Sequence, residues 1–184
     1  TPDGAADYVA TYDASAGTHK KVLLNNLPGG GGGSGKVLQV VSVTKTDTFS
    51  TTSTTFTDVT GLTANITPSS TSSRIFALAT ISIGGTSGTA PTATLARSGT
   101  PVFLGDAASS RTRMGAGIGL SADASVYNLA MNFVDSPATT SSTTYSVQLR
   151  ASGSTAYINR ANDDADSASR YRGASSLILI EIGA

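Results

Sequence analysis

The sequence contains no cysteine, no tryptophan and a single histidine in 184 residues. Without cysteine, neither a disulfide nor a thiolate metal site can hold the fold, so stability must come from packing and strand pairing. Charged residues are also scarce, at 13% of the chain against roughly 25% in an ordinary soluble protein. Because low charge weakens the repulsion that keeps proteins apart, we expect self-association.

The charge that is present is balanced, with 12 Lys and Arg against 12 Asp and Glu. No net field would draw the protein to nucleic acid or to an anionic membrane, so we expect neither partner. No apolar run approaches the roughly 20 residues of a membrane span, and the N-terminal residues lack the pattern of a signal peptide. We therefore expect no membrane insertion. A role outside the cell would need release by lysis or assembly, or an export signal missing from this chain.

Composition divides the chain into three parts. Residues 1–28 contain two short β-type runs around a small-residue turn, which predicts an adaptor or stem hairpin. Residues 29–36 read GGGGGSGK, and glycines are costly to order, so this segment is expected to be a flexible linker. Residues 37–184 form the main domain. At 184 residues the chain is long enough for one such domain but not for two.

Short β-type runs separated by Gly, Pro, Asp or Ser recur about every ten residues in the main domain, which is typical of a sandwich or barrel. In RIFALATISI, strand alternation places Ile75, Ala77, Ala79, Ile81 and Ile83 on one face. No segment carries a helical stripe, so we predict an all-β, antiparallel, jelly-roll-like β-sandwich. The other expected strands are VLQVVSVTK, TFSTTSTTFTDV, LTANIT, TATLAR, PVFLGD, RMGAGIGLS, VYNLAMNFVD, TTYSVQLR, TAYINR and SSLILIEIG.

Gly30 to Lys36 matches the G-x-x-x-x-G-K part of a phosphate-binding loop. However, Val37 stands where a Ser or Thr would ligate magnesium. A strand-forming segment also follows, where the loop requires a helix whose N-terminal amides hold the phosphate. We therefore expect no nucleotide and no other cofactor.

No catalytic residue is predicted. The only histidine, His19, is expected in the adaptor turn beside two lysines, away from any Ser nucleophile. The only glutamate, Glu181, alternates with the isoleucines of the last strand and is expected to face outward or into an interface. Most aspartates are expected at turns, where side-chain to backbone bonds explain them. These are Asp47, Asp58, Asp106, Asp123 and Asp135. A pair of aspartates in a glycoside-cleaving groove remains the alternative.

The acidic group Asp163, Asp164 and Asp166 resembles a calcium loop at first sight. Counted from Asn162, an EF-hand would need Gly and Glu where the chain has Ser167 and Gly173. The three aspartates stay candidates for an irregular calcium site. The reading we favour is a solvated loop in which nearby arginines, at positions 160, 170 and 172, balance the charge.

Arg111 and Arg113 lie with Arg150 in a second basic group. The planar guanidinium binds carboxylated sugars or phosphate, and it can equally pair with aspartates across a subunit interface, the reading favoured here. The residues expected to face a receptor from exposed loops are Arg111, Arg113, Asp163, Asp164, Arg170, Tyr171 and Arg172.

The stretch DYVATYDASAGTHKKVLLNNLPGGGGGSGKVLQVV resembles the junction in tail-fibre and other virion appendage proteins of bacterial viruses, where a stem leads through glycines into a terminal β domain. TFTDVTGLTANITPSSTSSRIFALATISIGG, FLGDAASSRTRM, MNFVDSPATTSSTTYSVQLR and RGASSLILIEIGA look like blocks of such terminal domains. The resemblance implies a trimeric jelly-roll-like knob, of the kind also found in complement-type and tumour-necrosis-factor-like domains.

We therefore expect a non-enzymatic virion protein, assembled in the host cytoplasm and carried on the extracellular particle. It would be a homotrimer that joins other virion proteins through its N-terminal segment and binds a host glycan or protein through loops. Because a long fibrous shaft is missing from this chain, a head fibre or one domain of a longer protein is also compatible. A decoration protein without receptor binding is the first rival, and a polysaccharide-degrading enzyme the second.

Overall fold

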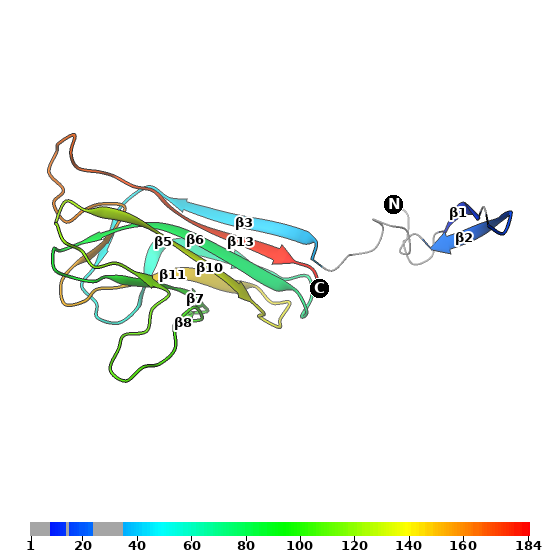
Figure 1. The fold of residues 1–184 in the computed structure, drawn as a ribbon, viewed down its shortest axis with the longest axis horizontal. Helices are drawn as coiled ribbons and strands as arrows, with labels where there is room; N and C mark the ends of the chain where they lie inside the picture. The colour runs from blue at the N-terminus through cyan, green and yellow to red at the C-terminus, as the bar shows by residue number, and fades with distance from the viewer. Residues whose placement is uncertain (1–7, 14, 24–34) are drawn as a thin grey trace.

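The computed structural model describes residues 8–13, 15–23 and 35–184, and these residues form strands and loops with no helix (Figure 1). In the described ranges the chain thus has no helix of the length and apolarity needed to cross a membrane. The predicted all-β class is confirmed. Most of the expected Gly-rich linker and the matched phosphate-loop residues 30–34 lie outside the described residues.

The two strands expected in the first part of the chain are present as a hairpin. Strands β1 (Tyr8–Asp13) and β2 (Thr18–Leu23) pair antiparallel in a two-stranded sheet of their own. Its turn includes Gly17 at φ 64°, a left-handed conformation that glycine adopts without strain. His19 is the second residue of β2, with its ring 5.4 Å from that of Tyr12, so its predicted place in the turn was wrong.

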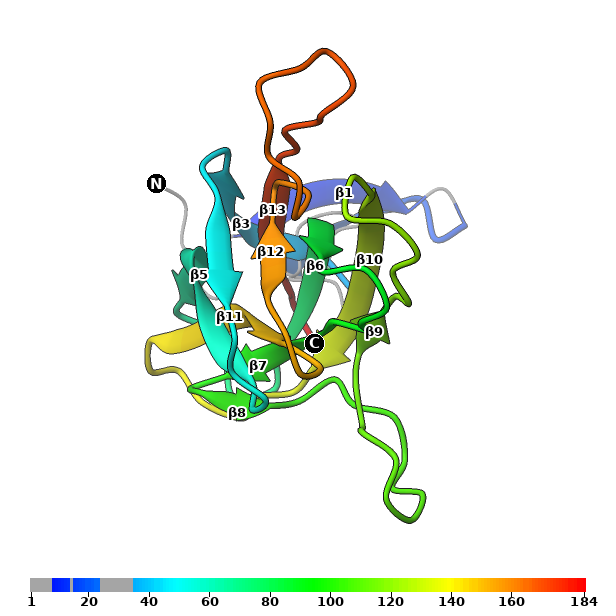
Figure 2. The same cartoon turned by 90° about the vertical axis from the view of Figure 1, so that its left-hand side faces the viewer.

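The remaining strands form two antiparallel sheets packed face to face (Figures 1 and 2). One sheet contains β3 (Val37–Lys45), β4 (Phe49–Thr51), β6 (Arg74–Gly85), β10 (Val126–Asp135), β12 (Ala156–Ile158) and β13 (Ser175–Ile182). The other contains β5 (Thr57–Ile66), β7 (Thr92–Arg97), β8 (Thr100–Pro101), β9 (Ala116–Gly117) and β11 (Thr143–Arg150).

The strand order is that of a jelly roll. In the first sheet, β6 pairs with β13 and β12 along one edge and with β10 along the other, giving β3-β13-β6-β10 for the long strands. In the second sheet the order is β5-β11-β7, and β8 and β9 pair with β7 as two pieces of one interrupted strand. If the short β4 and β12 are left out and β8 and β9 are counted as one strand, the eight strands of the domain can be numbered along the chain. The strand orders of the two sheets are then 1-8-3-6 and 2-7-4-5. This double Greek key confirms the predicted sandwich.

The core lies between the sheets and follows the alternation of the strands. The five residues of β6 predicted to share one face are all buried, which confirms that prediction. From the opposite sheet, the side chains of Leu95, Tyr145 and Leu149 are completely buried against them. Buried aliphatic surface of this kind is the main stabilising contribution, at about 25 cal/mol per Å² removed from water.

Two expected strands are almost absent. PVFLGD and RMGAGIGLS contribute only the short β8 and β9, and the chain between them leaves the sheet as a loop closed by the bond from the Gly105 amide to the Met114 carbonyl, 3.1 Å. TFSTTSTTFTDV is also divided, because the hydroxyl of Ser53 bonds to the carbonyl of Thr55 at 2.8 Å. Such local side-chain bonds compete with strand pairing.

The sandwich has two distinct ends. Gly35 lies beside the last strand, with its amide 2.6 Å from the carbonyl oxygen of Gly183, and the C-terminal residue is at the same end (Figure 1). The segment 159–174, which we call the distal loop, joins β12 to β13 at the opposite end (Figure 1). The main domain is therefore entered at one end and presents this loop at the other.

Candidate functional site

The distal loop is anchored by a buried asparagine. Asn159 follows β12 with φ 64° and is completely buried. Its side-chain amide donates to the carbonyl oxygens of Lys45 and Asp47 at 2.8 and 2.9 Å, and its side-chain oxygen accepts the hydroxyl of Ser175 at 2.6 Å. Asparagine tolerates the left-handed backbone conformation better than most residues, so one side chain both turns the chain and joins three segments.

The two ends of the distal loop also approach β6 very closely. The amide of Asn159 donates to the carbonyl of Ser82 at 2.8 Å, and the amide of Ser82 donates to the hydroxyl of Ser175 at 3.0 Å. At Gly173, a Cβ atom would lie 2.1 Å from the hydroxyl oxygen of Ser82. Only glycine fits there, so the loop leaves and rejoins the sandwich along a fixed path.

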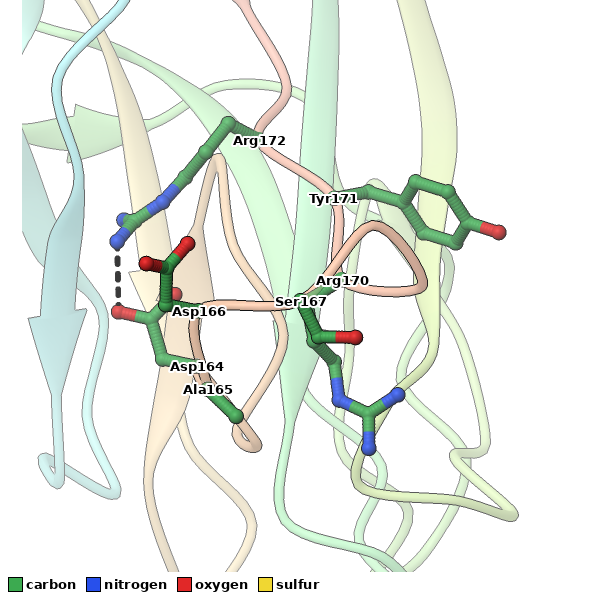
Figure 3. A pocket seen from close by; sticks show the side chains of 7 residues that line it. All are labelled: Asp164, Ala165, Asp166, Ser167, Arg170, Tyr171 and Arg172. Atoms are coloured by element: carbon green, nitrogen blue, oxygen red, sulfur yellow. Dashed lines mark hydrogen bonds and ion pairs between the residues drawn. The ribbon is translucent and has the colours of Figure 1, made fainter.

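Within the loop, aspartates and arginines are paired. Asp164 accepts one bond from Arg160 and one from Arg172, each at 2.7 Å (Figure 3 shows the second). Asp163 pairs with Arg170, whose Nε lies 2.8 Å from the same carboxylate oxygen that its Nη2 contacts. The predicted balancing of the acidic group by arginines at these three positions is therefore present.

This pairing fixes the electrostatics of the loop. The hydrogen bond from Arg170, followed by that from the amide of Ala165, lowers the pKa of Asp163 below its ordinary value. The guanidinium of Arg160 also lies 4.0 Å from the ring centre of Tyr157, a cation–π distance. Three arginines and three aspartates give the loop no net formal charge. Its charges are therefore balanced, and its surface is rich in hydrogen-bonding groups.

Two shallow hollows border the distal loop, one beside its middle and one where it returns to the sheet. The first, of about 300 Å³, is lined by Asp164, Asp166, Ser167, Arg170 and the two residues that follow it (Figure 3). The second, of about 280 Å³, lies against β10 and is lined by Val126 and Asn128. Tyr171 and Arg172 line both hollows. The structure thus brings together all five residues predicted on this loop, with Asp166 beside them.

Arg111 and Arg113, the other two predicted residues, are elsewhere. They lie on the loop between β8 and β9, which extends from the body in the opposite direction to the distal loop (Figure 2). Nε of Arg113 donates to the carbonyl of Gly105 at 2.6 Å, a bond that shapes this loop. The seven predicted residues therefore form two separate groups. Their role in receptor binding stays a prediction.

Two aspartates expected at turns lie instead in strands. Asp135 ends β10, where it accepts two bonds from Arg97 at 2.9 and 2.7 Å and one from the hydroxyl of Tyr145 at 2.6 Å. Burial first, then this bond, raises the pKa of Tyr145 far above its ordinary value. Asp58 lies in β5 and accepts bonds from side chains of β11 at 2.7 and 2.9 Å. Asp58 thus connects two neighbouring strands, and Asp135 connects the two sheets.

The prediction that Glu181 faces outward or into an interface was wrong. It does face opposite the isoleucines, but that side is the interior, and the residue is only 1% exposed. Its carboxylate accepts bonds from the amide and hydroxyl of Ser69 at 2.7 and 2.6 Å and from Gln39 at 2.6 Å. Burial, the largest influence, raises its pKa, but the bonds from Ser69 and Gln39 outweigh it and hold the pKa at about 2. Glu181 thus fastens the loop after β5 to β13.

The alternative of an irregular calcium site at Asp163, Asp164 and Asp166 gains no support from the geometry. Among residues 8–13, 15–23 and 35–184, no group of three or more His, Asp or Glu side chains is arranged to hold a metal ion. Asp163 and Asp164 already bind guanidinium groups. A cation would have to displace those groups first.

A feature that the sequence reasoning missed lies on the outer face of the six-stranded sheet. Direct cross-strand pairing places Val40, Ile180, Phe76 and Val134 in one row across four strands. Val40 is 57% exposed and Val134 48%. An antiparallel sheet with one free face usually carries polar residues there, so this apolar row is unusual. The signal was present in SLILIEI, which is apolar at successive positions and therefore on both faces.

No protein-family model matches this sequence, and no curated protein matches it. Among solved structures, one of the Gt strain of infectious bursal disease virus aligns over 97% of this chain, with a TM-score of 0.44 and 15% identity. One of the Gx strain aligns over 95%, with a TM-score of 0.40 and 16% identity. This chain spans only 43% and 42% of those chains. Similarity at this level carries no inference about function.

Proposed function

We propose that this chain is a non-enzymatic structural protein of a virus particle, which assembles with copies of itself and presents the distal loop to a host surface. The observation that carries the proposal is the apolar outer face at the side of a sandwich whose loop projects from one end. The assignment to a virus particle rests on the sequence resemblance to virion appendage proteins. The fold alone would not support it, because jelly rolls serve many functions.

The chemistry of the outer face favours a second copy of this chain as its partner. The rows Val40–Ile180–Phe76–Val134, Ser42–Ile178–Leu78–Asn132 and Thr44–Ser176–Thr80–Ala130 contain no charged residue. Interface centres are depleted in charge in the same way. From the strand spacing and rise, the rows cover roughly 300 Å² in projection, so they would form the centre of an interface in which each partner buries roughly 800 Å² of accessible surface.

Three copies joined along this face would present three distal loops in one direction. Each loop makes only a few contacts, but linked copies bind at a high effective concentration, which multiplies a weak single affinity. The pairs Arg97–Asp135 and Ser69–Glu181 support the non-enzymatic part of the proposal, because these two carboxylates are bonded to structural partners within the fold.

Two measurements test the proposal. Native mass spectrometry of the full chain should give three times 18.4 kDa at micromolar concentration. Electron cryomicroscopy of the native particle should show threefold knobs at fibre tips, with the distal loop outward. A stable monomer would contradict self-assembly. Copies tiling a shell would favour the decoration role and contradict host attachment.

A further inference from the structure

We infer that the two hollows beside Tyr171 bind a neutral saccharide, with the tyrosine ring as the stacking surface between them. The inference rests on the proposed attachment role and specifies its ligand.

Tyr171 is the aromatic side chain that the loop leaves in solvent. It is 62% exposed and borders both hollows, and in Figure 3 its ring projects away from the pair formed by Asp164 and Arg172. Exposing an aromatic ring forgoes the free energy that burying it would provide, about 1.5–3 kcal/mol for a large apolar side chain. A pyranose ring carries one face of C–H groups, which packs against such a ring while its hydroxyl groups remain at the rim.

Groups that bind hydroxyls surround the ring. Within the described residues, the carboxylate of Asp166 has no hydrogen-bond or ion-pair partner, so its oxygens are free to accept. The side chain of Arg172 is 58% exposed and has donors beyond the one given to Asp164. Asn128, exposed on β10, can both donate and accept. A sugar hydroxyl also does both, and this mixed set matches it.

Charge selects a neutral ligand. An anionic sugar is usually held by a guanidinium in a two-bond fork. Here Arg160, Arg170 and Arg172 are each bonded to an aspartate, and the loop has no net charge. A carboxylated or sulfated sugar would find only the remaining donors of these paired arginines, and it would meet the unpaired Asp166.

The test uses the full chain on immobilised neutral oligosaccharides of glucose, galactose and N-acetylglucosamine, beside sialylated and uronic-acid chains of equal length. We expect binding to at least one neutral chain and none to the acidic ones. Tyr171→Ala should weaken that binding at least tenfold, while Tyr171→Phe, which keeps the ring, should stay within about threefold. Tyr12→Ala is the matched control, because Tyr12 is 63% exposed on the hairpin.

Adsorption of the same variants to host cells distinguishes a failure of the saccharide inference from a failure of the proposed attachment role. If the wild-type chain adsorbs and Tyr171→Ala adsorbs equally, the saccharide inference is wrong while attachment stands. Binding of acidic chains alone, or of no chain by a protein that adsorbs to cells, also overturns it. A chain that neither adsorbs nor binds any saccharide contradicts both.

Discussion

The backbone amide of Gly173 donates to the carbonyl oxygen of Asn159 at 3.0 Å, so the two residues close the distal loop at its base. The same asparagine reaches the turn after β3 and the first residue of β13. The base of the distal loop is therefore part of the sandwich, even though the rest of the loop is exposed. Its geometry depends on a few buried polar contacts.

Replacing Asn159 by Ala should destabilise the main domain by about 2–4 kcal/mol. The change removes three hydrogen bonds, leaves the carbonyl oxygens of Lys45 and Asp47 without this donor, and places alanine at φ 64°. Urea unfolding monitored by circular dichroism measures the loss. Asn162→Ala, in the same loop but without such bonds, should change the free energy of unfolding by less than about 0.5 kcal/mol. Equal effects of both changes would show that the loop base is not a structural anchor.

A methyl group at Gly173 should be poorly tolerated. In Gly173→Ala the new Cβ would lie 2.5 Å from the Cβ of Ser82, and overpacking of this kind costs about 1–3 kcal/mol. Gly119→Ala is the control, since a Cβ there meets nothing within 4 Å. Ser82→Gly should recover part of the loss in a double-mutant cycle of unfolding free energies. If the effects of the two substitutions on the free energy of unfolding were strictly additive, the contact between positions 173 and 82 would not be the cause of the destabilisation.

The buried carboxylate of Glu181 should make stability depend on acid. Its pKa in the folded protein is about 2, below the ordinary value of 4.5, so the unfolded chain takes up its proton first as the pH falls. The contribution is therefore complete above pH 4.5 and is lost as the pH falls towards 2. Thermal unfolding between pH 6 and 2 should show a steeper loss for the wild type than for Glu181→Gln. Parallel pH profiles would mean that Glu181 is not held ionised by Ser69 and Gln39.

Alternation explains why the long strands could be predicted and the loops could not. The sequence predicted the bounds of β3, β7, β10 and β11 without error, because each is a run of β-type residues between turn residues. It overestimated the strands around β8 and β9. Gly115 and Gly117 lie where a side chain would collide with Phe103, Met114 or Thr92. The residues between β8 and β9 leave the sheet. A local pattern does not reveal such contacts.

The same limit applies to the site. The sequence predicted that arginines balance the aspartates of the distal loop, because the two kinds of residue are equal in number there. Which arginine pairs with which aspartate could be seen only in the fold. Asp135 was expected at a turn with bonds to the nearby backbone, yet Arg97 and Tyr145 reach it from the other sheet. Glu181 looked exposed because it alternates with Ile180 and Ile182, which were expected to face the core but lie on the outer side of the sheet. Partners distant in sequence, such as Ser69, make its burial possible.

Disrupting the apolar outer face should dissociate the assembly while leaving each copy folded. Val40 is 57% exposed on the edge strand β3, so Val40→Asp buries no charge in an isolated copy and should cost it no more than about 1 kcal/mol. In the assembly the carboxylate would lie in an apolar interface without a partner, at a cost of several kcal/mol. Analytical ultracentrifugation should therefore show a monomer, with the circular dichroism spectrum of the wild type.

Met114→Asp provides the matched control for that experiment. Met114 is 42% exposed but lies on the loop between β8 and β9, outside the apolar row. It should leave the mass of the assembly unchanged, since a carboxylate there stays in water. If both variants dissociate, exposed charge acts through general repulsion. If neither does, the copies associate through another surface, and the row formed by Val40, Ile180, Phe76 and Val134 needs a different partner.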